Sequence, residues 1–400
     1  MKILTLEDFD TSKKTVFLRV DMNCPIEPDT SKIIEFSRIE EACESINALK
    51  ESKVVVASHQ GRVGRYDYID MHQHAEILSR LLNRRVEFVE DVIGPEARKM
   101  IKNMNDGEIL LLDNLRFCAE ENYEYSFSEA ANTVMVKRLA DYFDVCVLDC
   151  FPSAHRAHPS IVGFSHKLPA LAGKIVAREV NTLDEILTIS KSPFVVVLGG
   201  AKVSDRLEAI DTLVSSGRAD KVLLTGLISL VFLKALGQLK NLDQDDSQVE
   251  KAKKLLTKYP NIIEVPLDYA INNNGERKEK DVKELEKEDK ALDIGHKTIK
   301  HYSKIINSAG TVFMSGPAGA FEKEDYAYGT KELLDVIASS FCTSIISGGH
   351  LNAALHRYKL AEKIDHISTA GGALVLYLAG KRLPMLESLK EAAARINKSC

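Results

Sequence analysis

Residues 194–206 read FVVVLGGAKVSDR, an apolar run that ends in a glycine pair and a lysine. A short run of Val, Leu and Phe predicts a strand buried on both faces, followed here by a turn and a helix. Glycines let a phosphate approach backbone N–H groups, and a helix N-terminus favours negative charge. The stretch therefore predicts an anion site at a strand–turn–helix unit. A purely structural turn is the alternative, because the pattern G-x-x-x-x-G-K-[ST] is absent.

The same alternation of apolar runs and amphipathic stretches fills the chain. Helical patterns include residues 37–50, 74–82 and 128–143. Strands are expected at 14–21, 53–59, 86–90, 108–114, 145–151, 194–200, 221–226, 262–269, 311–316, 344–349 and 366–372. Such alternation is typical of parallel sheets covered on both faces. The sequence thus predicts an α/β protein with two doubly wound parallel-sheet domains and a cleft between them.

Two stretches connect or interrupt these domains. Residues 171–190 form an amphipathic pattern without a turn signal, between Pro169 and Pro193, and predict an inter-domain linker helix. The second domain then covers 191–381. Residues 272–293 are mostly charged, and we expect a solvated loop or an exposed helix there, with an interaction arm as the alternative.

Composition narrows the functional class. The chain has 400 residues, 45% hydrophobic and 28% charged, with a net charge of −5. These values are ordinary for a globular enzyme and disfavour nucleic-acid or membrane-surface binding. The N-terminal MKILTLEDFD lacks a signal-peptide core, and no apolar run approaches the roughly 20 residues of a membrane span, so we expect a cytoplasmic protein. The seven scattered cysteines favour reduced thiols.

Polar residues follow the strands of the first half, where a doubly wound sheet binds ligands. They are Asp21 and Asn23; His59, Arg62 and Arg65; Asn114 and Arg116; His155, Arg156 and His158; and Arg38 at the first helix. Any one arginine is expected to form a surface salt bridge. Several guanidinium groups around one crevice, without matching carboxylates, instead predict a small polyanionic ligand.

Zinc is a weaker alternative for part of this set. Cys146, Cys150, His155 and His158 have a zinc-like spacing. Both cysteines, however, fall within one expected strand at an even separation. They are therefore expected to share a buried face and behave as small hydrophobic residues.

Glycine-bearing strand exits recur in the second half. Besides 199–202, they are MSGPAGAFE (314–322), SGGHLNAA (347–354) and STAGGA (368–373). Together they predict a nucleotide lying across that sheet, and the whole layout predicts a phosphoryl-transfer enzyme that closes on its substrates. A dinucleotide dehydrogenase is a rival, weakened by the absence of G-x-G-x-x-G. A non-catalytic two-lobed binding protein is another.

Seven ordered motifs resemble those of the phosphoglycerate kinase family, over nearly the whole chain and closest to its archaeal branch. They are RVDMNCP (19–25), SHQGR (58–62), DNLRF (113–117), AHRAHPS (154–160), GGAKVSDR (199–206), SGPAGAFE (315–322) and STAGGA (368–373). The resemblance implies reversible phosphoryl transfer between 1,3-bisphosphoglycerate with ADP and 3-phosphoglycerate with ATP, in glycolysis and gluconeogenesis. It also implies Mg²⁺, hinge-bending, a monomer or homodimer, and residues 382–400 returning to the first domain (1–170).

The resemblance also assigns site residues. Phosphoglycerate would be held by Asp21, Asn23, Arg38, His59, Gln60, Gly61, Arg62, Arg116 and Arg156. The nucleotide would be held by Lys202, Gly316, Glu322, Ser347, Gly348, Gly349 and His350, with Glu322 on the ribose. Arg38, Lys202 and Gly349 would act on the transferred group. The imidazoles of AHRAHPS are interpreted as support for Arg156.

The chain departs from the family pattern at three places. His350 stands where much of the family has an aspartate near the metal, so the metal ligands are unknown. Arg206 replaces a lysine, and Met314 with Ser315 replace Trp-Asn, so adenosine contacts are expected to differ.

Overall fold

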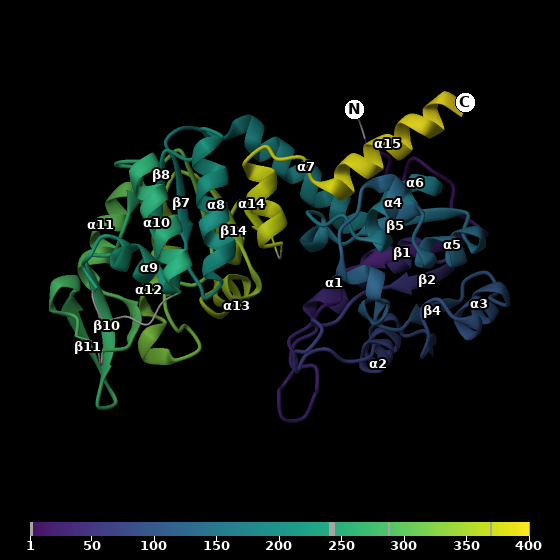
Figure 1. The fold of residues 1–400 in the computed structure, drawn as a ribbon, viewed down its shortest axis with the longest axis horizontal. Coiled ribbons are helices and arrows are strands. Elements are labelled where there is room, and N and C mark those ends of the chain that lie inside the picture. Colours follow the sequence, from purple (N-terminus) through teal and green to yellow (C-terminus); the bar gives the residue numbers. More distant parts are fainter. Residues whose placement is uncertain (1–2, 240–244, 287–288, 369, 400) are drawn as a thin grey trace. The chain divides into compact units, whose positions relative to one another are not determined.

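The computed structural model describes residues 3–239, 245–286, 289–368 and 370–399. The chain forms two compact units, each with its own core (Figure 1). Unit 1 comprises Met1–Asn181 with Arg382–Cys400, and unit 2 comprises Thr182–Lys381. Helix α7 (Lys174–Ile189) contains the position at which the chain passes from unit 1 to unit 2. Within the described ranges, no helix is both long and apolar enough to span a membrane.

Unit 1 is built on a six-stranded parallel sheet of order β3-β4-β2-β1-β5-β6. Its strands are β1 (Thr15–Val20), β2 (Lys53–Ala57), β3 (Val86–Val89), β4 (Ile109–Leu112), β5 (Val145–Asp149) and β6 (Ala170–Ala172). Every residue of β4 and β5 is buried, so both faces of the sheet are covered. The chain leaves β1 toward β2 on one side and later returns to β5 on the other. This switch point is where a doubly wound sheet places its ligand.

The helices of unit 1 follow the apolar stripes of the sequence. They are α1 (Ser37–Ala48), α2 (His72–Leu82), α3 (Pro95–Lys102), α4 (Phe127–Ala131), α5 (Val134–Leu139), α6 (Phe164–Lys167) and α15 (Pro384–Ser399). In α1, Ile39, Ala42 and Ile46 are buried at the spacing the sequence predicts. The C-terminal α15 packs on α6 and β6 of unit 1 (Figure 1).

Unit 2 contains a second six-stranded parallel sheet, of order β9-β8-β7-β13-β14-β15. Its strands are β7 (Phe194–Leu198), β8 (Lys221–Leu224), β9 (Ile263–Glu264), β13 (Thr311–Ser315), β14 (Thr343–Ser347) and β15 (His366–Ser368). In order of appearance this is 3-2-1-4-5-6, the order of doubly wound nucleotide-binding sheets. Its switch point lies between β7 and β13, and the predicted α/β class is confirmed.

The helices of unit 2 alternate with these strands. They are α8 (Val203–Ser215), α9 (Gly226–Ala235), α10 (Asp246–Lys258), α11 (His296–Asn307), α12 (Tyr328–Ser339), α13 (Gly349–Arg357) and α14 (Gly372–Leu378). Helices α8, α13 and α14 begin just after β7, β14 and β15. Thr369 of the predicted strand 366–372 lies outside the described residues.

The prediction for residues 272–293 is wrong. A three-stranded antiparallel sheet, β11-β10-β12, occupies this part of unit 2, and residues 287–288 lie outside the description. Its strands are β10 (Asp268–Asn273), β11 (Glu276–Asp281) and β12 (Ala291–Ile294). Asn274 and Gly275, both at positive φ, form the two-residue turn of the β10–β11 hairpin. The predicted single strand 262–269 is likewise divided between β9 and β10.

Two predicted helices have different bounds. Residues 128–143 form two helices, α4 and α5, instead of one. Ser126 caps the start of α4 together with Glu129, and a second helix begins after Thr133. Residues 171–172 of the predicted linker helix belong to β6, and the helix begins only at Lys174. Gly173 permits this close join, since a Cβ there would lie 2.4 Å from the Asp149 side chain.

At the switch point of unit 2, glycines let three loops pack backbone against backbone. The Gly200 N–H donates to Pro317 O at 2.8 Å, and the Gly226 N–H donates to Ala318 O at 3.0 Å. A Cβ on Gly199 would lie 2.2 Å from Pro317 O, and one on Gly316 would lie 2.4 Å from Gly199 O. These contacts fix the exit of β7 against the exit of β13.

We expect Gly199→Ala to lower the free energy of unfolding by about 1–3 kcal/mol, because the added methyl overpacks a backbone contact. The matched control is Gly371→Ala, where a Cβ would meet no described atom within 4 Å. Denaturant titration followed by circular dichroism measures both changes. Equal midpoints for Gly199→Ala and the parent chain would contradict the packing argument.

A buried histidine makes unit 1 sensitive to acid. His74 on α2 donates from Nε2 toward Met22 O at 3.1 Å and Gln60 Oε1 at 3.2 Å, so it is neutral with the proton on Nε2. Its Nδ1 has no hydrogen-bond partner among the described residues. Burial lowers the pKa of His74 from 6.5 to about 4.

A histidine whose pKa is lower in the folded state than in the unfolded state stabilises the fold at pH values above its unfolded pKa. For His74, that stability is lost as the pH falls from 6.5 toward 4, by up to about 1.4 kcal/mol per pH unit. We expect His74→Gln, which keeps a donor at the same reach, to lose less stability over this window. Urea titrations at several pH values measure the difference. Parallel pH profiles for the two proteins would exclude His74 as the titrating group.

Candidate functional site

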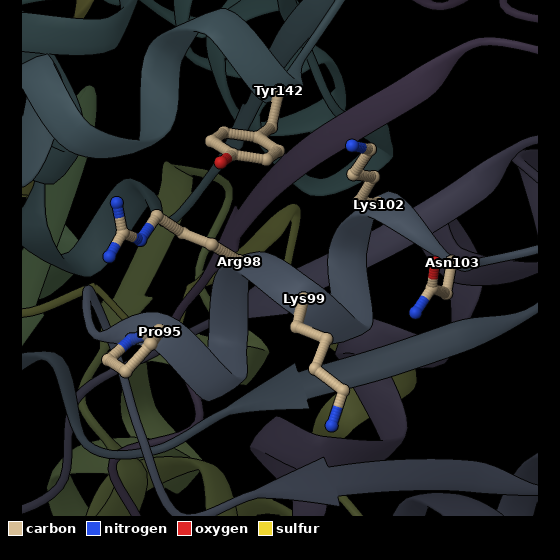
Figure 2. A pocket seen from close by; sticks show the side chains of 6 residues that line it. All are labelled: Pro95, Arg98, Lys99, Lys102, Asn103 and Tyr142. Atoms are coloured by element: carbon tan, nitrogen blue, oxygen red, sulfur yellow. The ribbon is translucent and has the colours of Figure 1, made fainter.

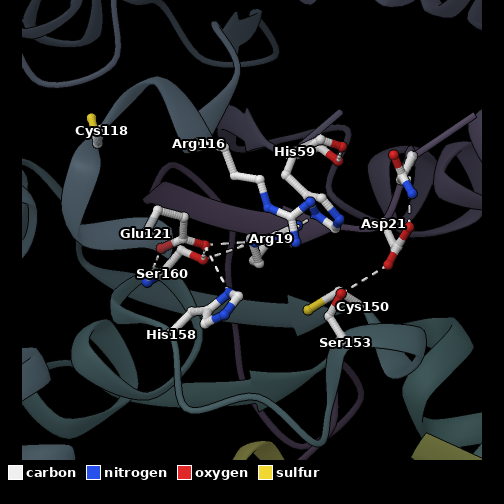
Figure 3. Close-up of polar contacts among 12 residues, drawn as sticks. Arg19, Asp21, His59, Arg116, Cys118, Glu121, Cys150, Ser153, His158 and Ser160 are labelled. Atoms are coloured by element: carbon white, nitrogen blue, oxygen red, sulfur yellow. Dashed lines mark hydrogen bonds and ion pairs between the residues drawn. The ribbon is translucent and has the colours of Figure 1, made fainter. Parts of the chain in front are cut away.

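The site of unit 1 begins where β1 and β5 end. Asp21 follows β1, and its Oδ1 accepts from Arg38 Nη1 of α1 at 2.6 Å. Its Oδ2 accepts from Ser153 Oγ at 2.9 Å, from the short helix η4 (Phe151–Ser153) after β5 (Figure 3). Burial alone would raise the pKa of Asp21, but the charges of Arg38 and Arg19 outweigh burial and hold this pKa well below its usual value. Asp21 is therefore a fixed anion that anchors Arg38.

Arg19, on β1 itself, lies behind this pair. Its Nε donates to Ser160 Oγ at 2.9 Å and its Nη2 to His59 Nδ1 at 3.0 Å. Burial, together with the charges of Arg19, Arg116 and Arg156, keeps the pKa of His59 well below 6.5 despite the nearby Asp21. His59 is therefore neutral near pH 7.

A buried carboxyl group supports Arg19 from the other side. Glu121 follows the short helix η1 (Leu115–Phe117), in η2 (Ala119–Asn122), and is fully buried. It accepts from Ser160 Oγ at 2.5 Å and from Ser160 N at 3.1 Å, and lies 3.9 Å from Arg19 Nη2. His158 Nδ1 is 3.7 Å away. Burial raises the pKa of Glu121, and it lowers the pKa of His158 to about 3.

Arg116, on η1, completes the cationic group. Its Nη1 donates to Gly61 O, which holds the loop after β2. Burial, followed by the charges of Arg156, Arg19 and Arg62, lowers the pKa of Arg116 to about 10. Each of these three guanidinium groups therefore lies within electrostatic reach of Arg116. Arg62, Arg116 and Arg156 are among the arginines that the sequence assigns to one crevice, and that assignment stays a prediction.

The remaining predicted residues shape the loop after β2. Asn23 Oδ1 accepts from Gly61 N at 2.8 Å, and Gly61 adopts φ of 66°, where a Cβ would clash with the Asp67 carbonyl. Gln60 Oε1 accepts from Cys24 N at 2.8 Å and its Nε2 donates to Cys24 O at 3.0 Å. Gln60 is fully buried, so these contacts favour a loop-holding role for its side chain over ligand contact. Arg65 is exposed.

Sequence reasoning missed Arg19, Glu121, Ser153 and Ser160. Arg19 carried a signal, because it is the charged residue within the apolar run TVFLRV of β1. The contacts of Glu121 and Ser160 had no such signal, since Ser160 meets Arg19 across 141 positions. The cysteines of the zinc-like spacing, Cys146 and Cys150, are both buried, and burial raises the pKa of each thiol. No group of three metal-ligating side chains occurs among the described residues.

In unit 2, the predicted nucleotide residues lie at strand exits. Lys202 precedes α8, and its side chain is exposed. Gly348, at φ of 111°, and Gly349 open α13, and a Cβ on either would meet no atom within 4 Å in the part described. Ser347 is buried and donates from Oγ to Ala370 O at 2.7 Å. The Gly348 N–H already donates to Ser368 O at 3.0 Å, so the open backbone at the start of α13 is that of Gly349.

Two of the departures from the family pattern, Arg206 and Ser315, contact each other. Arg206 donates from Nε to Gly199 O at 3.1 Å and from Nη1 to Ser315 Oγ at 3.0 Å, so it braces the β7 and β13 exits from within. Met314 and Ser315 are fully buried. His350 Nε2 lies 3.9 Å from Glu322 Oε1, and both side chains are exposed.

A separate hollow of about 270 Å³ lies against α3, lined by Arg98, Lys99, Lys102, Pro95, Asn103 and Tyr142. Its basic side chains point in different directions (Figure 2). Lys99 pairs with Glu96 at 3.2 Å, and Arg98 Nε donates to Gly94 O at 3.1 Å. Unlike the group around Arg19, these cations do not converge on one point.

Comparison with known proteins identifies the family. The profile described as phosphoglycerate kinase matches residues 6–381. The phosphoglycerate kinase of Methanococcus maripaludis is 42% identical and covers 97% of this chain and 98% of its own. The crystal structure of phosphoglycerate kinase from Pyrococcus horikoshii OT3 superimposes with a TM-score of 0.89 at 37% identity, covering 98% of this chain and 100% of that one.

The structure of phosphoglycerate kinase from Coxiella burnetii gives a TM-score of 0.74 at 30% identity, covering 98% and 99% of the two chains. Profile, relatives and structures agree over nearly the full length. The chain therefore belongs to the phosphoglycerate kinase family and has the activity of an ATP:3-phospho-D-glycerate 1-phosphotransferase.

Proposed function

We propose that the arginine group of unit 1 binds 3-phosphoglycerate and 1,3-bisphosphoglycerate. The observation that carries this proposal is the convergence of Arg19, Arg62, Arg116 and Arg156, which depresses the pKa of Arg116. Two carboxyl groups lie nearby: Asp21 accepts from Arg38, and Glu121 accepts from Ser160. Guanidinium groups bind phosphate and carboxylate through paired N–H donors, so this group of arginines matches a small ligand that carries both.

Individual residues receive distinct roles in this proposal. Arg62, Arg116 and Arg156 bind the phosphate that is not transferred. At the ligand hydroxyl, Asp21 accepts a hydrogen bond, Asn23 donates from Nδ2 and His59 donates from Nε2. Gln60 and Gly61 hold the loop that carries Arg62. Arg38 is fixed by Asp21 at 2.6 Å and directs its remaining donors to the transferred phosphoryl group.

ATP and ADP are co-substrates of the family, and we propose that they bind at the strand exits of unit 2. The backbone N–H groups of Gly349 and Gly316 donate to phosphate oxygens, Gly348 leaves room for the phosphate, and Lys202 adds a mobile positive charge. Ser347 fixes the turn, and Glu322 accepts from the ribose hydroxyls with His350 beside it. Phosphoryl transfer needs little covalent help, so positioning and charge neutralisation supply most of the rate.

Mg²⁺ fits this site only as part of the nucleotide complex. It binds through one or two carboxylates together with substrate phosphates and water. His350 is a poor ligand for such a hard cation, and no cluster of three acidic or imidazole ligands occurs in the described ranges. Glu322 is the acidic side chain that accompanies His350. When bound, the ion neutralises phosphate charge, and we assign no step of the transfer to it.

We further propose that the enzyme is cytoplasmic and that hinge-bending brings the two bound substrates together. In-line transfer requires the attacking and leaving oxygens to reach one phosphorus atom, and closure also excludes water. Monomer and homodimer are both compatible with the proposal.

We expect Arg38→Ala to lower kcat by about 10³-fold, because this guanidinium stabilises the negative charge of the phosphoryl group during its transfer. A coupled assay of ATP-dependent 3-phosphoglycerate consumption measures it, with circular dichroism as the test of folding. The control is Arg98→Ala, which removes the same charge from α3, outside the cluster. Turnover of Arg38→Ala within a few-fold of the parent would remove Arg38 from the transfer step.

We expect Arg156→Ala to raise the KM for 3-phosphoglycerate by about 10- to 100-fold. This factor corresponds to the loss of one hydrogen bond between charged groups. The KM for ATP should stay unchanged, since the nucleotide binds in the other unit. Initial rates with each substrate varied in turn separate the two effects. An unaltered KM for 3-phosphoglycerate, or an equal rise for ATP, is incompatible with the assigned role.

A further inference from the structure

Arg19 occupies an unusual place for an arginine near a binding site. Its side chain is 1% exposed and emerges near the end of β1, among apolar residues. Each of its three guanidinium nitrogens contacts a protein atom: Nη1 donates to Val20 O, and Nε and Nη2 contact Ser160 Oγ and His59 Nδ1 (Figure 3). A charge buried this deeply is costly unless it is paired and hydrogen-bonded. Arg19 therefore acts on the site through its neighbours.

The contact with His59 determines a proton position. A guanidinium group has donors and no acceptor, so His59 Nδ1 must present its lone pair to Arg19 Nη2, 3.0 Å away. An imidazole with an unprotonated Nδ1 is neutral and carries its proton on Nε2. The ring nitrogen opposite Arg19 is thus a hydrogen-bond donor.

The hydrogen bonds on the two sides of Arg19 both run away from it, because a guanidinium group can only donate. Ser160 donates its hydroxyl proton to Glu121 Oε1 at 2.5 Å, which leaves its lone pair to accept from Arg19 Nε at 2.9 Å. Arg19 in turn donates to His59. The Glu121 carboxyl group also lies 3.9 Å from Arg19 Nη2 and offsets its charge. Glu121, Ser160 and Arg19 together form a buried relay in which Arg19 donates both to Ser160 and to His59 Nδ1.

We propose that Arg19 is a positioning residue that fixes the orientation and tautomer of His59, so that its Nε2–H is held as a neutral donor to the phosphoglycerate. This inference rests on the proposed function for the ligand contact of His59, whereas the tautomer itself is a property of the ligand-free protein. A lysine cannot replace Arg19, because one ammonium group lacks the planar fork that reaches Ser160 and His59 at once.

The test begins with the ligand-free, full-length parent enzyme. Histidines are labelled with ¹⁵N, and long-range ¹H–¹⁵N spectra near pH 7 report which ring nitrogen is protonated. The His59 signals are assigned by their loss in His59→Gln. We expect an unprotonated Nδ1 and a protonated Nε2. A protonated Nδ1, alone or together with Nε2, would overturn the proposal before any variant is made.

Two variants then remove the relay. Arg19→Met combined with Glu121→Gln deletes both charges and avoids leaving Glu121 buried without Arg19. Arg19→Lys keeps the charge and serves if the double variant does not fold. In each variant, we expect His59 to become a mixture of tautomers. The KM for 3-phosphoglycerate should rise about tenfold, because one hydrogen bond to a charged group is lost. The KM for ATP should not change.

The matched control is Ser160→Ala, which disturbs the same buried relay without touching His59. It should lower stability and leave the His59 tautomer intact. A tautomer unchanged in the Arg19 variants would refute the proposal, even if KM rises. If the proposed function is wrong instead, Arg156→Ala will have a parent-like KM for 3-phosphoglycerate while the His59 tautomer remains as expected.

Discussion

Repulsion between arginines at the β1–β5 switch point is the constraint on which the rest of unit 1 depends. Arg19, Arg62, Arg116 and Arg156 lie close enough for burial and mutual repulsion to lower the pKa of Arg116 to about 10. Asp21 and Glu121 lie beside this charge, and each accepts hydrogen bonds from protein donors. In the proposed function, a ligand with two anionic ends would relieve the repulsion. The cost of assembling the cluster in the folded protein would then become a source of affinity for phosphoglycerate.

Unit 2 is also proposed to bind an anion, but with little side-chain charge. Its doubly wound sheet brings Gly199, Gly316 and Gly226 into backbone contact, and Arg206 braces the same loops from within. A Cβ on Gly349 would meet no atom within 4 Å among the described residues, so the backbone at the start of α13 is open to a polyphosphate. In the proposed function, fixed dipoles and a single lysine suit a nucleotide that must also be released. The two units would then use different chemistry for two different anions.

The elements that sequence reasoning identified are those with strong local signals. β1, β5 and β7 are short apolar runs, and the polar residues after them meet at one sheet edge because parallel strands share a direction. β10 and β11 were missed because their charged residues outweighed the Asn274–Gly275 turn signal. Arg19 was passed over as part of a strand, and its partners lie far along the chain: Ser160 is separated by 141 positions and His59 by 40. Hydrogen-bond direction and tautomer follow only from such contacts, which no local pattern encodes.

Amide hydrogen exchange of the full-length enzyme, measured with each substrate alone, tests most directly whether unit 1 binds 3-phosphoglycerate and unit 2 binds the nucleotide. The account predicts that 3-phosphoglycerate slows amide exchange in residues 21–23, 58–62, 114–117 and 153–160. ATP should slow exchange in residues 199–203, 316–322 and 347–350 and leave the first group unchanged. Protection of the same segments by both substrates, or protection by 3-phosphoglycerate confined to unit 2, would contradict the account.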